Sequence, residues 1–135
     1  MRNRVILGSL LLVFAITTYS VAQGPAGNVA RGKYLVNNVA TCGDCHTPTD
    51  KKGQPIKGKQ LQGSALVFKP AIPIPSWIPV APSIAGLNWT DAQAIEFFTT
   101  GKRPDGTMAA PPMPQIRLKK ADAAAVTAYL KSLKP

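Results

Sequence analysis

The sequence predicts a small all-α domain in which three helices are joined by long proline-rich loops. Apolar residues recur at helical spacing in three segments, at about residues 28–39, 90–101 and 118–133. Most of the 13 prolines fall between these segments, where they discourage long helices and central strands. Once the N-terminal segment is set aside, residues 23–135 suffice for one domain with one core.

The first 22 residues have the features of a secretory signal peptide. Arg2 and Arg4 precede an apolar run over residues 5–19, and residues 20–22 supply the small side chains of a cleavage site. We therefore expect cleavage before Gln23 and a domain over residues 23–135 that is periplasmic or otherwise exported. The apolar run is shorter than the ~20 residues of a membrane-spanning helix, so membrane association is expected only if this segment is retained as an anchor.

The chain is strongly basic. It has 16 Lys and Arg against 6 Asp and Glu, and because Arg2 and Arg4 lie in the signal peptide, the mature domain keeps a charge of +8. Such a charge favours acidic protein partners or anionic surfaces. Nucleic acid is not an expected partner, because the lysines do not alternate with aromatic residues in one tract.

The predicted helices have local signals at their ends. Asn28 can cap the first helix, which runs to about Val39. Thr90 and Gln93 fit a capping box at the start of the second helix, and Gly101 ends it. The segment 118–133 is rich in alanine and has no internal Gly or Pro, so it is predicted as the third helix.

The loop from Pro48 to Gly86 is too apolar for a solvated linker. Its large apolar side chains include Leu66, Val67, Phe68, Ile72, Ile74, Trp77, Ile78 and Val80. A long ordered loop in so small a domain normally has a functional reason, and contact with a large flat apolar ligand would supply one. The sequence assigns no role to the proline-rich part, residues 69–82.

The segment Cys42-Gly43-Asp44-Cys45-His46 matches the haem-attachment motif Cys-x-x-Cys-His. The chain has two cysteines and one histidine, and all three lie in this segment. On one tight turn the two sulfurs can reach the two vinyl groups of a porphyrin, and the adjacent imidazole can bind the iron. We therefore expect one covalent haem c, attached at Cys42 and Cys45, with His46 as an iron ligand.

Other roles for the cysteine pair compete with haem attachment. A disulfide between Cys42 and Cys45 would close a very short loop and stabilise little. A zinc site would need a further Cys or His, and the chain has none. A thiol-disulfide oxidoreductase site stays open as an alternative, although such a site follows a strand, whereas a predicted helix precedes this motif.

A methionine is expected on the opposite face of the iron, because a thioether is the usual sixth ligand of low-spin electron carriers. Beyond the signal peptide the chain has Met108 and Met113. Met113 lies between Pro112 and Pro114, which fix the backbone and leave little entropy to lose. We expect Met113 as the ligand and Met108 as the alternative; either could instead fill a gap in the core.

These motifs resemble the class I c-type cytochromes, especially the monohaem domains found as free periplasmic carriers or as cytochrome subunits of alcohol and aldehyde dehydrogenases. The similar segments are Ala30 to Leu35 before the cysteine motif, Thr100 to Gly106, Pro111 to Pro114 and Asp122 to Leu133. The resemblance implies a cytochrome c-like single domain with long proline-rich loops around one haem. It also implies that the first and last helices cross near Gly32 and Tyr129, and that His46 and Met113 are the axial pair.

The expected function is electron transfer in the periplasm. No acid-base pair, nucleophile triad or phosphate loop is recognisable, so we do not expect an enzyme. The expected partners are redox proteins, acidic ones because the domain is basic. Two alternatives stay open, namely a haem-bearing, non-catalytic subunit of a dehydrogenase or oxidase complex, and a thiol-disulfide oxidoreductase.

Overall fold

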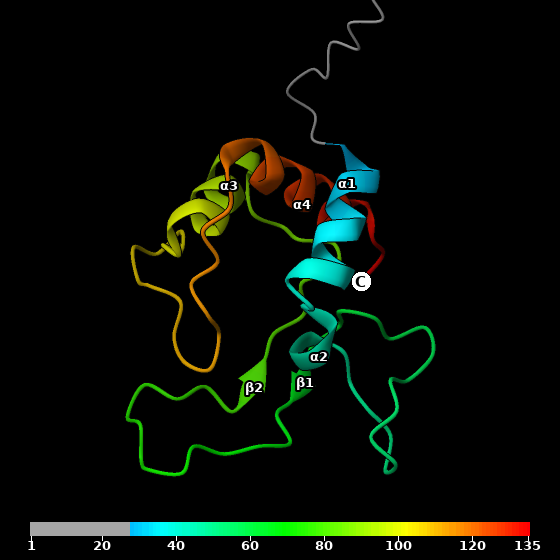
Figure 1. Cartoon of the computed structure of the whole chain (residues 1–135), viewed down its shortest axis with the longest axis vertical. Helices are drawn as coiled ribbons and strands as arrows, with labels where there is room; N and C mark the ends of the chain where they lie inside the picture. Colours follow the sequence, from blue (N-terminus) through cyan, green and yellow to red (C-terminus); the bar gives the residue numbers. More distant parts are fainter. Residues whose placement is uncertain (1–27) are drawn as a thin grey trace, which may run out of the picture.

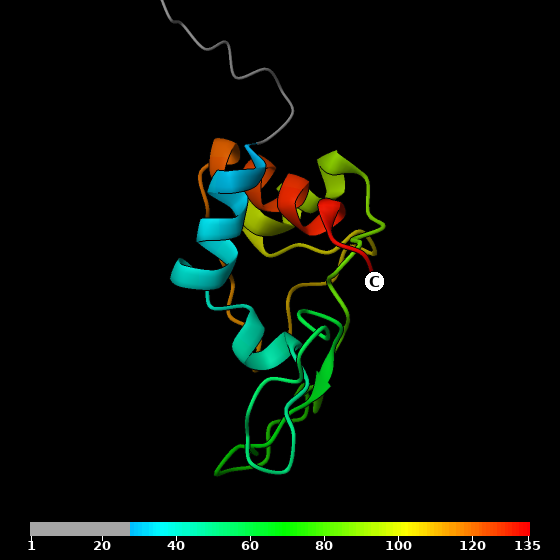
Figure 2. The same ribbon diagram turned by 90° about the vertical axis from the view of Figure 1, so that its right-hand side faces the viewer.

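The computed structural model of the protein describes residues 28–135. The predicted signal peptide, its cleavage site before Gln23 and residues 23–27 lie outside this part of the chain. The elements in chain order are α1 (Val29–Tyr34), the π-helical turn η1 (Leu35–Val39), α2 (Gly43–His46), β1 (Ser64–Ala65), β2 (Val80–Ala81), α3 (Asp91–Thr100) and α4 (Lys120–Ser132). Helices α1, α3 and α4 gather at one end of the molecule, and the strands and long loops form the other end (Figure 1, Figure 2). No helix within residues 28–135 has both the length and the apolarity needed to span a membrane.

The first predicted helix forms in two parts. It begins as predicted after Asn28, whose side-chain oxygen accepts a hydrogen bond from the Arg31 backbone N–H at 3.0 Å. From Leu35 the chain continues in the wider turn η1, in which the Ala40 N–H donates to the Leu35 carbonyl at 2.8 Å. Such π-helical turns are frequent at functional sites, and this one leads into the cysteine motif.

Helices α3 and α4 confirm the two other helical predictions. Thr90 Oγ1 accepts from the Gln93 N–H at 3.2 Å, and Gln93 Oε1 accepts from the Thr90 N–H at 3.0 Å, which is the predicted capping box. Gly101 ends α3 at a φ of 82°, where an L side chain would be strained. Helix α4 begins at Lys120, slightly later than predicted. The buried side chains of the two helices are Ala94, Phe97, Phe98, Ala123, Ala125, Val126, Thr127 and Leu130.

Helices α1 and α4 pack closely because residue 32 is glycine. A Cβ atom at Gly32 would lie 2.0 Å from the Ala125 carbonyl oxygen and 2.8 Å from Tyr129 Cβ. At the exposed edge of the contact, Arg31 Nε donates to Asp122 Oδ1 at 3.0 Å. This hydrogen bond from Arg31 holds the pKa of Asp122 below its usual value. The helix contact therefore depends on a position that tolerates no side chain.

The prediction of a purely α-helical domain needs a correction, because the long loop contains a small sheet. Strands β1 and β2 pair antiparallel, with Ser64 opposite Ala81 and Ala65 opposite Val80. A proline lacks the backbone N–H that donates to a neighbouring strand, but it does not prevent the residues before it from pairing. A strand of two residues can therefore end immediately before Pro82. The domain is therefore mostly helical, with one two-stranded sheet in the described part of the chain.

The long loop is fixed to the helical part through Leu61, which is only 2% exposed. Its backbone N–H donates to Thr47 Oγ1 at 3.0 Å, and its carbonyl accepts from the Ile84 N–H at 2.9 Å. These bonds hold Leu61 at a φ of 61°, which is uncommon for a residue other than glycine. The Gly63 N–H also donates to the His46 carbonyl at 2.7 Å, so the loop lies directly beside the cysteine motif.

Candidate functional site

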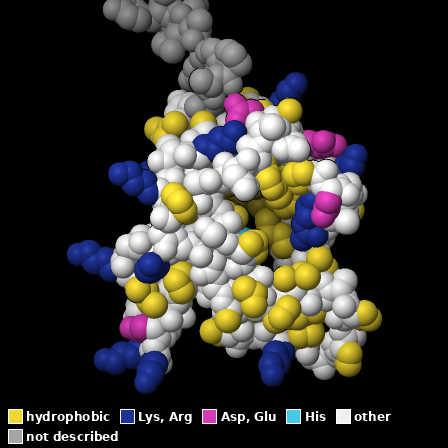
Figure 3. Space-filling view, turned by 180° about the vertical axis from the view of Figure 1, so that it is seen from behind, with side chains coloured by type: hydrophobic (Ala, Val, Ile, Leu, Met, Phe, Trp, Pro, Cys, Tyr) yellow, Lys and Arg dark blue, Asp and Glu magenta, His cyan; other side chains and the backbone are white. Residues whose placement is uncertain are grey.

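A cavity of about 270 Å³ lies between the helices and the long loops. Figure 3 shows it as a hollow in the surface whose walls are mainly hydrophobic side chains. The walls come from α2, from α3 and from parts of the loops within residues 66–89 and 103–114. Phe97 contributes to one wall and packs edge-to-face on Trp89 and on Phe98, with ring centroids 5.2 and 5.4 Å apart. The cavity therefore suits a large apolar ligand.

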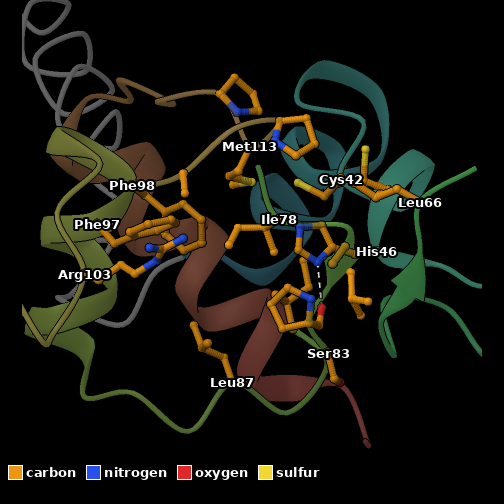
Figure 4. A pocket seen from close by; sticks show the side chains of 18 of the residues that line it. Cys42, His46, Leu66, Ile78, Ser83, Leu87, Phe97, Phe98, Arg103 and Met113 are labelled. Atoms are coloured by element: carbon orange, nitrogen blue, oxygen red, sulfur yellow. Dashed lines mark hydrogen bonds between the residues drawn. The ribbon is translucent and has the colours of Figure 1, made fainter. Parts of the chain in front are cut away.

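Helix α2 brings the motif residues Cys42, Cys45 and His46 to the same cavity. The helix is a single turn, in which the His46 N–H donates to the Cys42 carbonyl at 2.9 Å. The two thiols are not joined in a disulfide. Because the turn is so tight, both sulfurs and the imidazole are available to one ligand. Figure 4 shows Cys42 and His46 at this wall of the cavity.

The Cys42 thiol is a poor nucleophile in this environment. Burial is the main cause that raises its pKa to about 11; the nearby Asp44 and Cys45 add to this effect, and a backbone hydrogen bond opposes it. Thiol-disulfide oxidoreductases instead depend on a cysteine whose pKa is lowered, because the thiolate is the attacking species. The environment of Cys42 thus argues against the oxidoreductase alternative.

The His46 ring is buried and oriented by one hydrogen bond. It is 6% exposed, and its Nδ1 lies 2.7 Å from the Pro82 carbonyl oxygen (dashed in Figure 4). Because a carbonyl oxygen only accepts, Nδ1 carries the hydrogen, and Nε2 of the neutral ring keeps the lone pair that can bind a metal. Residues 28–135 hold no cluster of three His, Cys, Asp or Glu side chains that could bind a bare metal ion.

Met113 reaches the cavity from the loop between α3 and α4. Its backbone N–H donates to the Ala110 carbonyl at 3.0 Å, and the Ile78 N–H donates to the Pro111 carbonyl at 2.8 Å, which ties this loop to the proline-rich loop. Figure 4 shows the thioether of Met113 and the ring of His46 facing the same space. The alternative, Met108, is 45% exposed and does not line the cavity.

The donor set fits a covalently attached haem. Two thiols, one imidazole with a free lone pair and one thioether converge on an apolar space, which matches what this group requires. The structure therefore brings together all four site residues predicted from the sequence. It also adds two groups that the sequence did not indicate, namely the Pro82 carbonyl, which has no side-chain signal, and the Arg103 side chain at the cavity wall.

Comparisons with known proteins agree on one family. The family model described as cytochrome c matches residues 29–134. The chain is 31% identical to a diheme cytochrome c-type protein of Cereibacter sphaeroides, over 96% of this chain and 43% of that protein. It is 32% identical to the fructose dehydrogenase cytochrome subunit of Gluconobacter japonicus, over 76% and 21% of the two chains. It is 36% identical to the alcohol dehydrogenase (quinone) cytochrome c subunit of Gluconobacter oxydans, over 55% of this chain and 16% of that protein. The chain spans less than half the length of each of these relatives.

Proposed function

Because this chain belongs to the cytochrome c family, we propose that it carries one haem c and transfers single electrons in the periplasm. The observation that carries this proposal is the convergence of Cys42, Cys45, His46 and Met113 on one apolar cavity. The number of haems follows from the single Cys-x-x-Cys-His motif in the chain. The periplasmic location follows from the signal peptide predicted over residues 1–22.

Each site residue has a distinct task in this proposal. Cys42 and Cys45 would hold the haem covalently, and His46 and Met113 would supply the ligands of its iron. When bound, the haem supplies reversible one-electron chemistry. The Pro82 carbonyl orients the His46 ring and makes its Nε2 a stronger donor. Since backbone hydrogen bonds fix the segments that supply both ligands, neither has to move when the charge of the site changes.

Met113→Ala tests the electron-carrier proposal through the proposed sixth ligand of the iron. The exported variant is expected to lose the weak thioether-to-iron band at the red end of the oxidised spectrum. Its reduction potential is expected to fall by more than about 100 mV, because axial ligands tune haem potentials over roughly 0.8 V. Visible spectra and redox titration of the oxidised and reduced protein give both readouts.

Met108→Ala is the matched control, since it removes a thioether in the same loop that does not line the cavity. It is expected to leave the band and the potential unchanged. If Met108→Ala lost the band and Met113→Ala kept it, Met108 would be the iron ligand in place of Met113. A wild-type mass equal to that of the bare polypeptide would overturn the haem proposal itself.

A second function, as the electron-carrying subunit of a dehydrogenase complex, is favoured by an apolar surface beside the cavity. Val67 is 90% exposed and Ile72 is 72% exposed, and in the same loop Phe68 packs edge-to-face on Trp77. Figure 3 shows hydrophobic side chains continuing from the hollow across this part of the surface. Such a surface is typical of a protein interface. Two relatives are named as cytochrome subunits of dehydrogenases, so we propose a dehydrogenase subunit as its partner.

The double substitution Val67→Ser and Ile72→Ser tests this second function. The holoprotein is mixed with periplasmic extract of the producing cells and an alcohol or a sugar, and haem reduction is followed by absorbance. We expect substrate-dependent reduction to slow by about tenfold, because two apolar anchors are lost from the interface. Reduction by ascorbate should stay unchanged. Val29→Ser, at an exposed apolar position on α1, is the control; equal rates in all three proteins would contradict a docking role.

A further inference from the structure

The Pro82 carbonyl, which orients the His46 ring, is held in place by the residues on either side of it. Proline has no backbone N–H, so Pro82 itself donates no backbone hydrogen bond. On its N-terminal side, strand β2 pairs with β1 (Figure 1). On its C-terminal side, the N–H groups of residues 84 and 85 donate to the Leu61 carbonyl at 2.9 and 3.0 Å. The position of the Pro82 carbonyl is therefore set by the facing segment, residues 61–65.

Within this facing segment, Gly63 lies directly against the backbone of residues 81–83. A Cβ atom at Gly63 would lie 2.8 Å from the Ser83 nitrogen and 3.0 Å from the Pro82 carbonyl carbon. It would also lie 3.0 Å from the Ala81 carbonyl oxygen. All three are backbone atoms in a segment that is attached at both ends, so they cannot turn aside as a flexible side chain can. The Pro82 carbonyl therefore keeps its place only while residue 63 has no side chain.

Gly63 also holds the backbone of the histidine itself. Its N–H donates to the His46 carbonyl at 2.7 Å. One residue thus contacts both the backbone that carries the ring and the backbone that carries the acceptor of the ring. The distance from His46 Nδ1 to the Pro82 carbonyl oxygen is 2.7 Å, at the short end of the range for N–H···O hydrogen bonds. A displacement of either backbone would therefore weaken this bond, because the bond has little room to shorten.

We propose that Gly63 is a positioning residue for the His46 ring, because the space it leaves keeps the Pro82 carbonyl within hydrogen-bond distance of Nδ1. This inference rests on the proposed haem binding, in which Nε2 of the same ring is the iron ligand. A hydrogen bond at Nδ1 makes Nε2 a stronger donor. A stronger donor favours the oxidised iron, which carries the higher positive charge. Gly63 thus helps to set the reduction potential, although it does not line the cavity.

The test compares Gly63→Ala with Gly58→Ala in the exported holoprotein. Both glycines lie in the same loop and have left-handed φ values, 87° and 79°, so alanine strains the backbone at both positions. At Gly58, however, a Cβ would meet nothing within 4 Å. We expect the equilibrium constant for reduction to rise about threefold in Gly63→Ala, which is about 28 mV for one electron at 59 mV per tenfold change. Gly58→Ala should keep the wild-type potential.

A second readout reports on the His46 ring directly. In the NMR spectrum of the reduced protein, the Nδ1–H proton resonance should move upfield in Gly63→Ala, because its hydrogen bond is longer. The same resonance should stay in place in Gly58→Ala. If Gly63→Ala does not mature, Gly63→Asn takes its place. Asparagine tolerates a left-handed backbone better than alanine but keeps the Cβ atom, so the same two changes are expected.

Three outcomes would contradict the role of Gly63. A haem-loaded Gly63→Ala protein with the wild-type Nδ1–H resonance, whatever its potential, would overturn this inference alone. Equal changes in Gly63→Ala and Gly58→Ala would assign the effect to backbone strain and would overturn it as well. A wild-type protein without haem would overturn the proposed function together with this inference.

Discussion

Replacing both Cys42 and Cys45 with serine is expected to abolish covalent haem attachment. A hydroxyl does not add to a vinyl group as a thiol does, so neither bond can form. The intact mass of the exported variant should equal that of the polypeptide, whereas the wild type should exceed it by one haem. After extraction with acid and organic solvent the variant should be colourless, since any haem left would be held only through the iron ligands.

The matched control for the cysteine variant is Asp44→Asn. Asp44 lies between the two cysteines in α2, and its side chain is exposed. The substitution changes the same turn without touching a sulfur, so the covalent haem should remain. A double-serine protein that keeps the added mass would show that the haem is attached elsewhere. Loss of haem from Asp44→Asn would show that the turn, and not the sulfurs, decides attachment.

The parts of the fold that the sequence predicted are those with local signals. The capping box of Thr90 and Gln93 and the stop at Gly101 fix both ends of α3 within its own residues. The pairing of β1 with β2 has no such signal, because its partners are far apart in the chain and each strand is only two residues long. The left-handed backbone conformation of Leu61 likewise could not be predicted from the sequence, because it is held by contacts from other segments.

The same distinction applies to the site. The convergence of Cys42, Cys45 and His46 on one cavity could be predicted because the three residues lie in one turn. Met113 could be chosen over Met108 because prolines flank it, and the cavity supports that choice. The position of Arg103 at the cavity wall could not be predicted from its residue type, because a basic residue in a polar turn is usually solvated.

Substituting Gly32 with alanine is expected to lower the free energy of unfolding by about 2 to 4 kcal/mol. Helix propensity alone predicts the opposite, because alanine is better than glycine in a helix by about 1 kcal/mol. The contact with α4 decides whether the free energy of unfolding rises or falls in this variant. A Cβ at Gly32 would lie 2.0 Å from the Ala125 carbonyl oxygen and 2.6 Å from its carbon, and helix backbone cannot yield as a flexible side chain can. Helix α1 would therefore have to move away from α4.

Denaturant unfolding of the holoprotein, followed by far-UV circular dichroism, measures this loss, and Gly43→Ala is the matched control. Gly43 is also helical, but a Cβ there would meet only Thr47 Oγ1 at 3.4 Å, which is an ordinary contact. Its free energy of unfolding should change by less than about 1 kcal/mol. Intact masses should establish that both variants carry the haem. Equal or greater stability of Gly32→Ala would mean that helix propensity outweighs the contact, and the close packing of the first and last helices would have to be abandoned.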